Sequence, residues 1–189
     1  MTHLIRFPVS IPSDWQSSKA LTVADPYLRN WLLDTGSLTE RLQSHCMNFE
    51  LTVIGQRPMQ PELEEISQFS QSNHKQSEQQ WQIREVLLSG NGLPWVFARS
   101  ILPQALCDME FAELGSRPLG QIIFNDERFV RRPFQLLTIP PKHTFQQQLA
   151  VDLDMSLWGR RSVFNFNHLQ LMVAEVFLPD CPAYRQLER

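Results

Sequence analysis

The chain has 189 residues, of which 42% are hydrophobic and 20% charged, and its formal net charge is -3 at pH 7. This length suits one compact domain over residues 1–189, and the composition is that of an ordinary globular protein. The net charge provides no general attraction to nucleic acid or to an anionic membrane, so we expect neither partner, and any anion site must be local.

The cysteines and the N-terminal residues indicate the compartment. Cys46, Cys107 and Cys181 are an odd number at wide spacing, with neither a CxxC pair nor a disulfide framework. Free thiols of this kind are typical of a reducing compartment. No apolar run has the length of a secretory signal or reaches the ~18 residues of a membrane span. We therefore expect a cytoplasmic monomer that does not insert into the membrane.

The first third of the chain predicts short helices and one strand. Residues 1–24 show little periodicity and predict an irregular N-terminal arm. Asp25-Pro26 combines a capping residue with a first-turn proline and predicts a helix to about residue 34, and the capping-box pattern of Ser37-Leu38-Thr39-Glu40 predicts a second helix to about residue 44. Alternation over 49–56 predicts a strand. Residues 57–79 predict a long exposed loop, with one possible helical turn near 62–66, that is either disordered or a lid.

Residues 81–103 carry the strongest hairpin signal, because Asn91-Gly92 separates two runs rich in branched and aromatic residues. A two-residue turn places Arg84 opposite Arg99 on one apolar face. Like charges in that position destabilise a strand pair, so we expect matching anions from acidic side chains or from a ligand. Two alternatives remain open: an internal salt bridge or solvated arginine, and a three-residue loop that would separate the arginines onto opposite faces.

The second half predicts further helices and a second hairpin. Residues 103–114 have helical spacing, and a helix beginning at Arg117-Pro118-Leu119 would present free N–H groups near Leu119, either as a small anion site or as an ordinary helix start. A strand over 129–139 is interrupted by Pro133, and a polar helix-like segment extends to about 149–155. Residues 160–166 and 169–178 predict strands joined at Asn167-His168.

Glu175 is the carboxylate that this second hairpin places among large apolar neighbours. Leu171, Val173 and Phe177 share its face of the strand. Burial without a partner would raise its pKa, so Glu175 is either paired with an arginine or poised as an acid, base or hydrogen-bond anchor. A two-residue turn would put Arg160 opposite it, which is the structural alternative.

Motifs for several kinds of chemistry are missing from the sequence. It contains no HExxH, GxSxG, Walker or GxGxxG motif and no clustered Cys/His set. We therefore expect no metal and no cofactor. An interaction module without a pocket would leave the arginine pair and the apolar-faced glutamate unexplained.

Six sequence segments together resemble the chorismate pyruvate-lyases, which release 4-hydroxybenzoate at the start of ubiquinone biosynthesis. The segments are Trp31-Leu32-Leu33 with Ser37-Leu38-Thr39, Ile83 to Leu88, Pro94-Trp95 with Ala98-Arg99-Ser100, Pro118-Leu119-Gly120, Leu157 to Ser162, and Ala174 to Pro179. The resemblance covers most of the chain. It implies an α+β fold, in which an antiparallel sheet with flanking helices forms flaps over a buried ligand pocket.

The resemblance also implies site residues. Arg84, Leu119 and Glu175 fall on family ligand contacts, and Leu38 falls where the family usually has methionine, which matters little if the contact is made by the backbone. Arg84 and Glu175 are the candidates for the catalytic centre. Arg99 and Arg160 are further candidates for a second carboxylate or for orienting Glu175.

The implied reaction needs few groups. Chorismate loses its enolpyruvyl side chain from C3 and a proton from C4, and the ring becomes aromatic, so the enzyme must mainly hold a dianion, stabilise developing charge and exclude water. The alternative function is that of a small-molecule sensor, because the same fold resembles the effector domain of certain bacterial transcription regulators. Those sensors follow an N-terminal winged-helix domain, for which residues 1–24 are too short.

Overall fold

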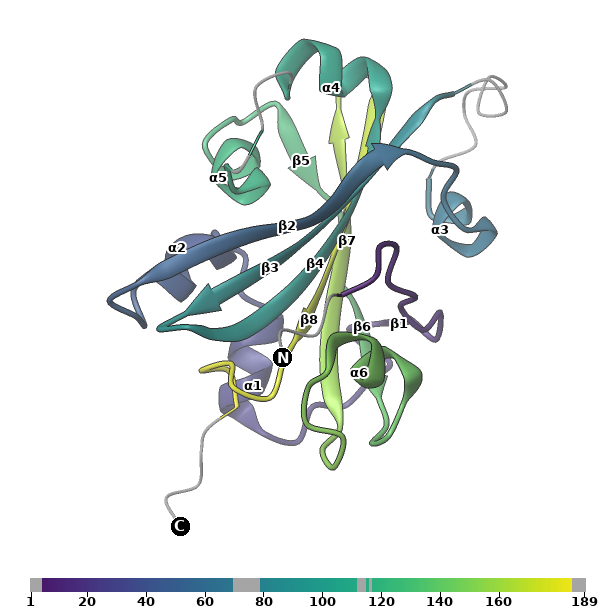
Figure 1. Ribbon diagram of the computed structural model, residues 1–189. Helices are drawn as coiled ribbons and strands as arrows, with labels where there is room; N and C mark the ends of the chain where they lie inside the picture. The colour runs from purple at the N-terminus through teal and green to yellow at the C-terminus, as the bar shows by residue number, and fades with distance from the viewer. Residues whose placement is uncertain (1–4, 70–78, 112–114, 116, 185–189) are drawn as a thin grey trace.

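The computed structural model describes residues 5–69, 79–111, 115 and 117–184. Its strands form one eight-stranded antiparallel sheet in the order β1-β6-β7-β8-β4-β3-β2, with β5 paired to β7. The strands are β1 (Gln16–Ser17), β2 (Phe49–Pro58), β3 (Trp81–Gly90), β4 (Leu93–Pro103), β5 (Phe129–Arg131), β6 (Gln135–Ile139), β7 (Leu157–Phe166) and β8 (Leu169–Phe177). The helices are α1 (Pro26–Leu32), α2 (Leu38–Gln43), α3 (Leu63–Ser67), α4 (Gln104–Glu110), α5 (Leu119–Phe124) and α6 (Thr144–Leu149). This is the predicted α+β architecture (Figure 1).

The twisted sheet is covered on both faces (Figure 1). Helices α1, α2, α4 and α5 pack on one face, called the site face below, and α3, α6 and residues 5–15 of the N-terminal arm pack on the opposite face. The site face carries two separate apolar clusters. One is built by α1 and α2 around Trp31 and Leu42, and the other by α4 and α5 around Leu106 and Phe166. Helices therefore flank the space between the two clusters, and neither cluster fills it.

The first hairpin turn forms as predicted. Asn91 and Gly92 have positive φ angles of 52° and 82°, which Asn and Gly tolerate best, and Gly90 pairs with Leu93 across the turn. The register then shifts, since Trp95 is an extra residue of β4 between the pairs Ser89–Pro94 and Leu88–Val96. A Cβ atom on Gly90 would collide with the Trp95 ring, so the glycine makes room for this β-bulge.

The bulge changes which residues of the hairpin share a face. Arg84 pairs with Ser100, and Arg99 pairs with Glu85. The prediction that Arg84 stands opposite Arg99 is therefore wrong, and the two guanidinium groups lie on opposite faces of the sheet. A one-residue register change has this effect because side chains alternate between faces, although here a bulge rather than a three-residue loop produces it.

The second hairpin confirms the predicted register. β7 and β8 are joined at Asn167-His168, where Asn167 has a φ of 52°, and Arg160 pairs with Glu175. No register shift interrupts this pair of strands. The arithmetic from a two-residue turn therefore holds along its whole length.

The helices begin largely as the capping residues predict. Asp25 Oδ1 accepts a 2.8 Å hydrogen bond from the N–H of Tyr27, and Ser37 Oγ accepts a 3.3 Å bond from the N–H of Glu40. Helix α6 ends at Leu149, at the lower limit of the predicted range, and Ala150 adopts a left-handed conformation directly after it. The strand predicted over 129–139 is divided into β5 and β6 around Pro133, and the predicted helical residues 112–114 lie outside the described residues.

Two predicted irregular regions contain more structure than expected. In the N-terminal arm, β1 pairs with β6. In the segment 57–79, β2 continues to Pro58 and α3 forms near the allowed helical turn, where Glu64 and Glu65 form ion pairs with arginines of the sheet. Residues 70–78 lie outside the described residues. The part of this segment before residue 70 is thus a packed cover of the sheet rather than only an exposed loop.

Candidate functional site

A cavity lies on the site face between the two apolar clusters. The strands β2, β3, β4, β5, β7 and β8 form its floor, and α2 and α5 cover it. The sheet contributes Leu51, Arg84, Val86, Leu88, Ala98, Ser100, Arg131, Arg160, Ser162, Phe164, Val173 and Glu175; the covering segments contribute Leu38, Thr39, Pro118, Leu119, Gly120, Ile123 and Phe124; and Phe134 closes one side. Five of the six residues named from the sequence line this cavity, and Arg99 does not.

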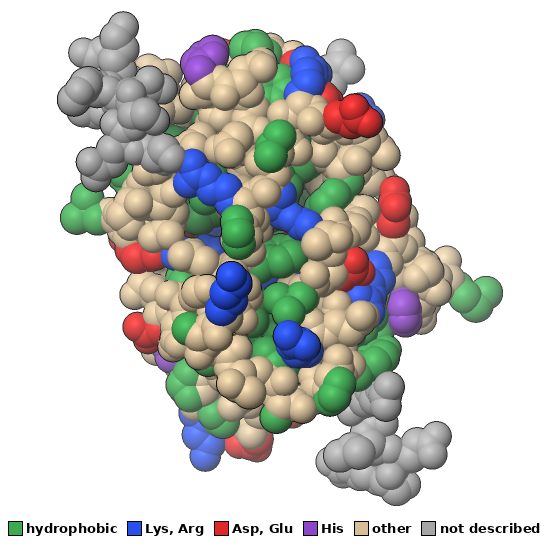
Figure 2. All heavy atoms as spheres, turned by 180° about the vertical axis from the view of Figure 1, so that it is seen from behind, with side chains coloured by type: hydrophobic (Ala, Val, Ile, Leu, Met, Phe, Trp, Pro, Cys, Tyr) green, Lys and Arg blue, Asp and Glu red, His purple; other side chains and the backbone are tan. Residues whose placement is uncertain are grey.

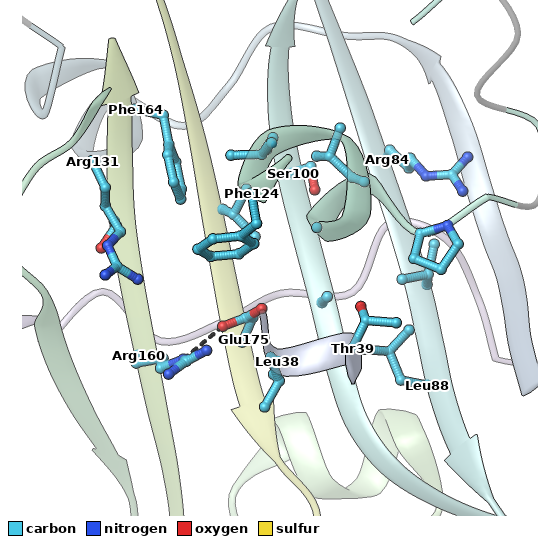
Figure 3. A pocket seen from close by; sticks show the side chains of 18 of the residues that line it. Leu38, Thr39, Arg84, Leu88, Ser100, Phe124, Arg131, Arg160, Phe164 and Glu175 are labelled. Carbon is cyan, nitrogen blue, oxygen red and sulfur yellow. Dashed lines mark hydrogen bonds and ion pairs between the residues drawn. The ribbon is translucent and has the colours of Figure 1, made fainter. Parts of the chain in front are cut away.

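Arg84 supplies an uncompensated positive charge at one end of the cavity (Figure 3). Its side chain is buried, with the residue only 3% exposed. Nη1 donates a 2.7 Å hydrogen bond to Gln56 Oε1, and Nη2 donates a 3.4 Å bond to the carbonyl of Arg117. Among the described residues no carboxylate pairs with it, and burial lowers the pKa of the Arg84 guanidinium. A ligand carboxylate would supply the missing negative charge.

Glu175 and Arg160 form an ion pair toward the other end of the cavity (Figure 3). Arg160 Nε donates a 2.7 Å hydrogen bond to Glu175 Oε2. Arg160 Nη1 also donates to the carbonyls of Trp31 and Asp34, each at 3.0 Å. The structure thus places Arg160 where it orients Glu175, and it uses much of Arg160's donor capacity on the protein itself. Glu175 Oε1 has no hydrogen-bond partner among the described residues and can accept one from a ligand hydroxyl.

Arg131 is a cavity residue that the sequence analysis missed. It is the last residue of β5 and pairs with Phe164 of β7, which directs it to the site face. Its guanidinium lies 4.4 Å from the centre of the Phe134 ring, and Nη2 donates a 3.1 Å hydrogen bond to the carbonyl of Thr35. Burial, together with the positive charge of Arg160, lowers the pKa of Arg131. The signal available in the sequence was an arginine between Phe129 and Phe134 in a predicted strand.

Arg99 belongs to an ionic cluster on the opposite face. Its Nε and Nη2 donate to the two carboxylate oxygens of Glu65 at 2.8 and 3.1 Å, and Nη1 donates to Glu85 Oε1 at 2.7 Å. Burial lowers the pKa of Arg99, but Glu65 and then Glu85 outweigh this effect, so that its pKa is raised. Arg99 is therefore matched by protein carboxylates, which corresponds to the salt-bridge alternative left open by the sequence.

Leu38 and Leu119 lie in the covering helices α2 and α5 and are 3% and 8% exposed. The helices approach each other closely, because a Cβ atom on Gly120 would lie 3.3 Å from Thr39 Oγ1. Both leucines line the cavity, and a role of their backbone in holding a carboxylate stays a prediction.

The cavity has a positive charge that the whole chain does not have. Three guanidinium groups and one carboxylate line it, which gives a local net charge of plus two, whereas the chain as a whole carries -3. Figure 2 shows one face of the molecule, on which Lys and Arg side chains lie across the middle, while several acidic side chains lie nearer the rim. An anionic ligand is thus favoured locally, as the composition required.

Two further observations concern the described residues only. They contain no group of three or more His, Cys, Asp or Glu side chains arranged to hold a metal ion. In the same part of the chain, no helix is both long and apolar enough to cross a membrane.

Solved structures with the same fold include an effector domain and a ligand-binding domain. The effector domain of PhnF from Mycobacterium smegmatis matches with a TM-score of 0.56 and 11% identity, covering 77% of this chain and 90% of that one. The ligand-binding domain of a putative GntR-family transcriptional regulator from Bordetella bronchiseptica matches with a TM-score of 0.53 and 14% identity, covering 71% and 85% of the two chains. At these identities the matches show the fold alone.

Sequence relatives identify the family. A protein of Pseudoalteromonas atlantica named probable chorismate pyruvate-lyase is 47% identical over 171 residues, which are 90% of this chain and 89% of that protein. A protein of Shewanella frigidimarina with the same name is 33% identical over 202 residues and covers 95% of each chain. The chorismate lyase family model matches residues 11–188. The chain therefore belongs to the chorismate lyase family.

Proposed function

We propose that this chain converts chorismate to 4-hydroxybenzoate and pyruvate. Two lines of argument support the proposal: membership of the chorismate lyase family over nearly the whole chain, and a cavity whose charged groups suit the substrate. The observation that carries it is Arg84, a buried guanidinium without a carboxylate partner among the described residues. A charge left in this state costs free energy unless a ligand neutralises it.

The reaction removes the enolpyruvyl group from C3 of the ring and a proton from C4. The C3–O bond breaks, the electrons of the C4–H bond form the new ring double bond, and the departing enolpyruvate takes up a proton to become pyruvate. The ring becomes aromatic, which drives the reaction forward. The protein must therefore position the dianion, exclude water and provide oriented charge, and each of these can contribute several kcal/mol.

The proposed roles follow from the two ends of the cavity. Arg84 holds the ring carboxylate, with help from backbone N–H groups at Leu38 and Leu119. Glu175 lies at the other end and accepts a hydrogen bond from the C4 hydroxyl (Figure 3). The ring between them lies against apolar residues such as Val86 and Val173.

Glu175 can serve this reaction in two ways. As a general base it would take the C4 proton, whereas as an anchor it would only fix the ring while the proton passes to the enolpyruvyl group in a concerted step. In either role the contact to the hydroxyl is retained in the product. Since α2 and α5 cover the cavity, we propose that 4-hydroxybenzoate leaves slowly and inhibits the protein.

The product would supply ubiquinone synthesis, and we expect the protein to act in the cytoplasm as a monomer.

The alternative is a domain that binds a small molecule without converting it. The regulators that share the fold support this alternative only at the level of architecture, because they are 14% identical or less among the matches described above. The relatives named as lyases are 47% and 33% identical. The enzyme is therefore the favoured function.

Incubation of the purified protein with chorismate tests the proposal. Absorbance should report 4-hydroxybenzoate, and lactate dehydrogenase with NADH should report an equal amount of pyruvate. Arg84→Ala should be inactive under the same conditions. Chorismate that is bound by the protein but remains unconverted would instead identify a sensor.

A further inference from the structure

Chorismate carries two carboxylates, and the roles proposed above account for only one of them. The ring carboxylate lies para to C4, so with Arg84 at one end and Glu175 at the other the ring is fixed along its axis. The enolpyruvyl group is attached at C3, next to the hydroxyl-bearing carbon. Its carboxylate must therefore emerge at the Glu175 end of the cavity, far from Arg84.

Two guanidinium groups lie at that end, those of Arg160 and Arg131 (Figure 3). Arg160 already donates to Glu175 and to two backbone carbonyls. Arg131 donates a single hydrogen bond, to the carbonyl of Thr35, and has no carboxylate partner among the described residues. Of five guanidinium N–H donors, Arg131 therefore retains most for a ligand.

The surroundings of Arg131 fix the plane of its guanidinium group. The Phe134 ring lies against it at 4.4 Å, and the Phe124 ring of α5 is 5.7 Å away. Burial and the neighbouring Arg160 lower the pKa of Arg131, and the charges of Glu175 and Asp34 offset this only in part. A planar, oriented donor group with unused N–H groups is suited to a carboxylate.

We propose that Arg131 binds the enolpyruvyl carboxylate of chorismate and thereby distinguishes the substrate from the aromatic product. The inference rests on the proposed function, since it assigns the second charge of that substrate. It also explains the charge of the cavity: the three arginines and Glu175 give plus two, which matches the chorismate dianion, whereas 4-hydroxybenzoate carries one carboxylate.

The test compares one variant with two ligands. Arg131→Ala should lower kcat/KM for chorismate by on the order of tenfold to a hundredfold, because a charge-assisted contact in a partly buried site is lost. The dissociation constant for 4-hydroxybenzoate, measured by calorimetry, should stay within about twofold, because the product lacks the enolpyruvyl group; an unchanged value also shows that the variant is folded. Arg131→Lys should recover part of the loss, since lysine keeps the charge but not the planar fork.

Arg29→Ala is the matched control, because Arg29 is an exposed arginine of α1 and its removal changes the net charge equally. This control should behave as the wild type does. If Arg131→Ala weakens the interaction with chorismate and with 4-hydroxybenzoate equally, or changes neither, the inference is overturned. If the wild type does not convert chorismate, the proposed function fails instead, and calorimetry with chorismate against 4-hydroxybenzoate still decides whether Arg131 recognises the second carboxylate.

Discussion

Arg160 stands directly across the β7–β8 pair from Glu175, and its Nε donates a 2.7 Å hydrogen bond to Oε2, which leaves Oε1 for the ligand. Replacing Glu175 with Gln keeps the shape and one acceptor but removes the charge. If Glu175 takes the C4 proton, the chemical step in a single turnover should fall by about 10²- to 10⁴-fold. If it only anchors the ring, product affinity should fall while the chemical step slows only modestly.

Rapid-quench measurement of the chemical step and calorimetry with 4-hydroxybenzoate separate these roles. Wild-type values in both measurements would show that Glu175 is only a structural partner of Arg160.

Arg84 is expected to bind substrate and product alike, because both carry the ring carboxylate. Arg84→Ala should weaken both by ~2 to 5 kcal/mol, the usual effect of leaving a buried carboxylate without its charged partner. Arg84→Lys should restore only part of this, since lysine lacks the planar fork. Calorimetry with 4-hydroxybenzoate measures the effect, and unaltered affinity in Arg84→Ala would remove Arg84 from the site.

The stability of the ligand-free protein provides a second readout for Arg84. Its charge is buried without a carboxylate among the described residues, so Arg84→Met should not lower the melting temperature even though it weakens ligand binding. A clear loss of stability would instead indicate a structural role.

Chelation tests the expectation that no metal takes part. The residues lining the cavity include one carboxylate and neither histidine nor cysteine, a poor donor set for a divalent ion. Turnover should therefore survive exhaustive dialysis against EDTA. Activity that disappears on chelation and returns with a divalent ion would contradict the prediction.

The two hairpins show what local sequence signals determine and what they miss. The turn at Asn167-His168 sets the pairing of Arg160 with Glu175, and no later irregularity changes it. The turn at Asn91-Gly92 is just as clear, but the bulge at Trp95 lies beyond it and moves Arg99 to the opposite face. Whether a strand contains one extra residue depends on packing, here of the Trp95 ring against Gly90, and turn propensity gives no information about it.

The contribution of Arg131 was missed for a different reason. Its place in the cavity depends on β5 pairing with β7, more than thirty residues further along the chain, after a break at Pro133. Such a long-range pairing leaves no local pattern. The family resemblance supplied Leu38 and Leu119, whose positions in α2 and α5 over the cavity also arise from tertiary packing rather than from local sequence.

Arg99 provides the last prediction, because the structure places it outside the cavity and against Glu85, which is fully buried. In Arg99→Met, the Glu85 carboxylate would keep its hydrogen bond from the Val9 N–H but would lose its positively charged partner. The loss of one partner of a buried ion pair typically costs ~3 to 5 kcal/mol of unfolding free energy. The affinity of the folded variant for 4-hydroxybenzoate should be unchanged. Arg161→Met is the matched comparison. Glu64, the partner of Arg161, is 33% exposed and can turn to water, so Arg161→Met should lose less unfolding free energy than Arg99→Met.

The loss in Arg99→Met should also depend on pH, with a sign that follows from Glu85. Burial raises the pKa of Glu85 above its usual 4.5, and the Val9 hydrogen bond and Arg99 offset this only partly. Without Arg99 the pKa rises further, and a group whose pKa is raised by folding loses stability as the pH rises through that pKa. The destabilisation of Arg99→Met relative to wild type should therefore be small near pH 4.5 to 5 and grow toward pH 8. Urea unfolding at both pH values measures it; an equal loss at both, or weakened 4-hydroxybenzoate binding in the folded variant, would contradict a purely structural role for Arg99.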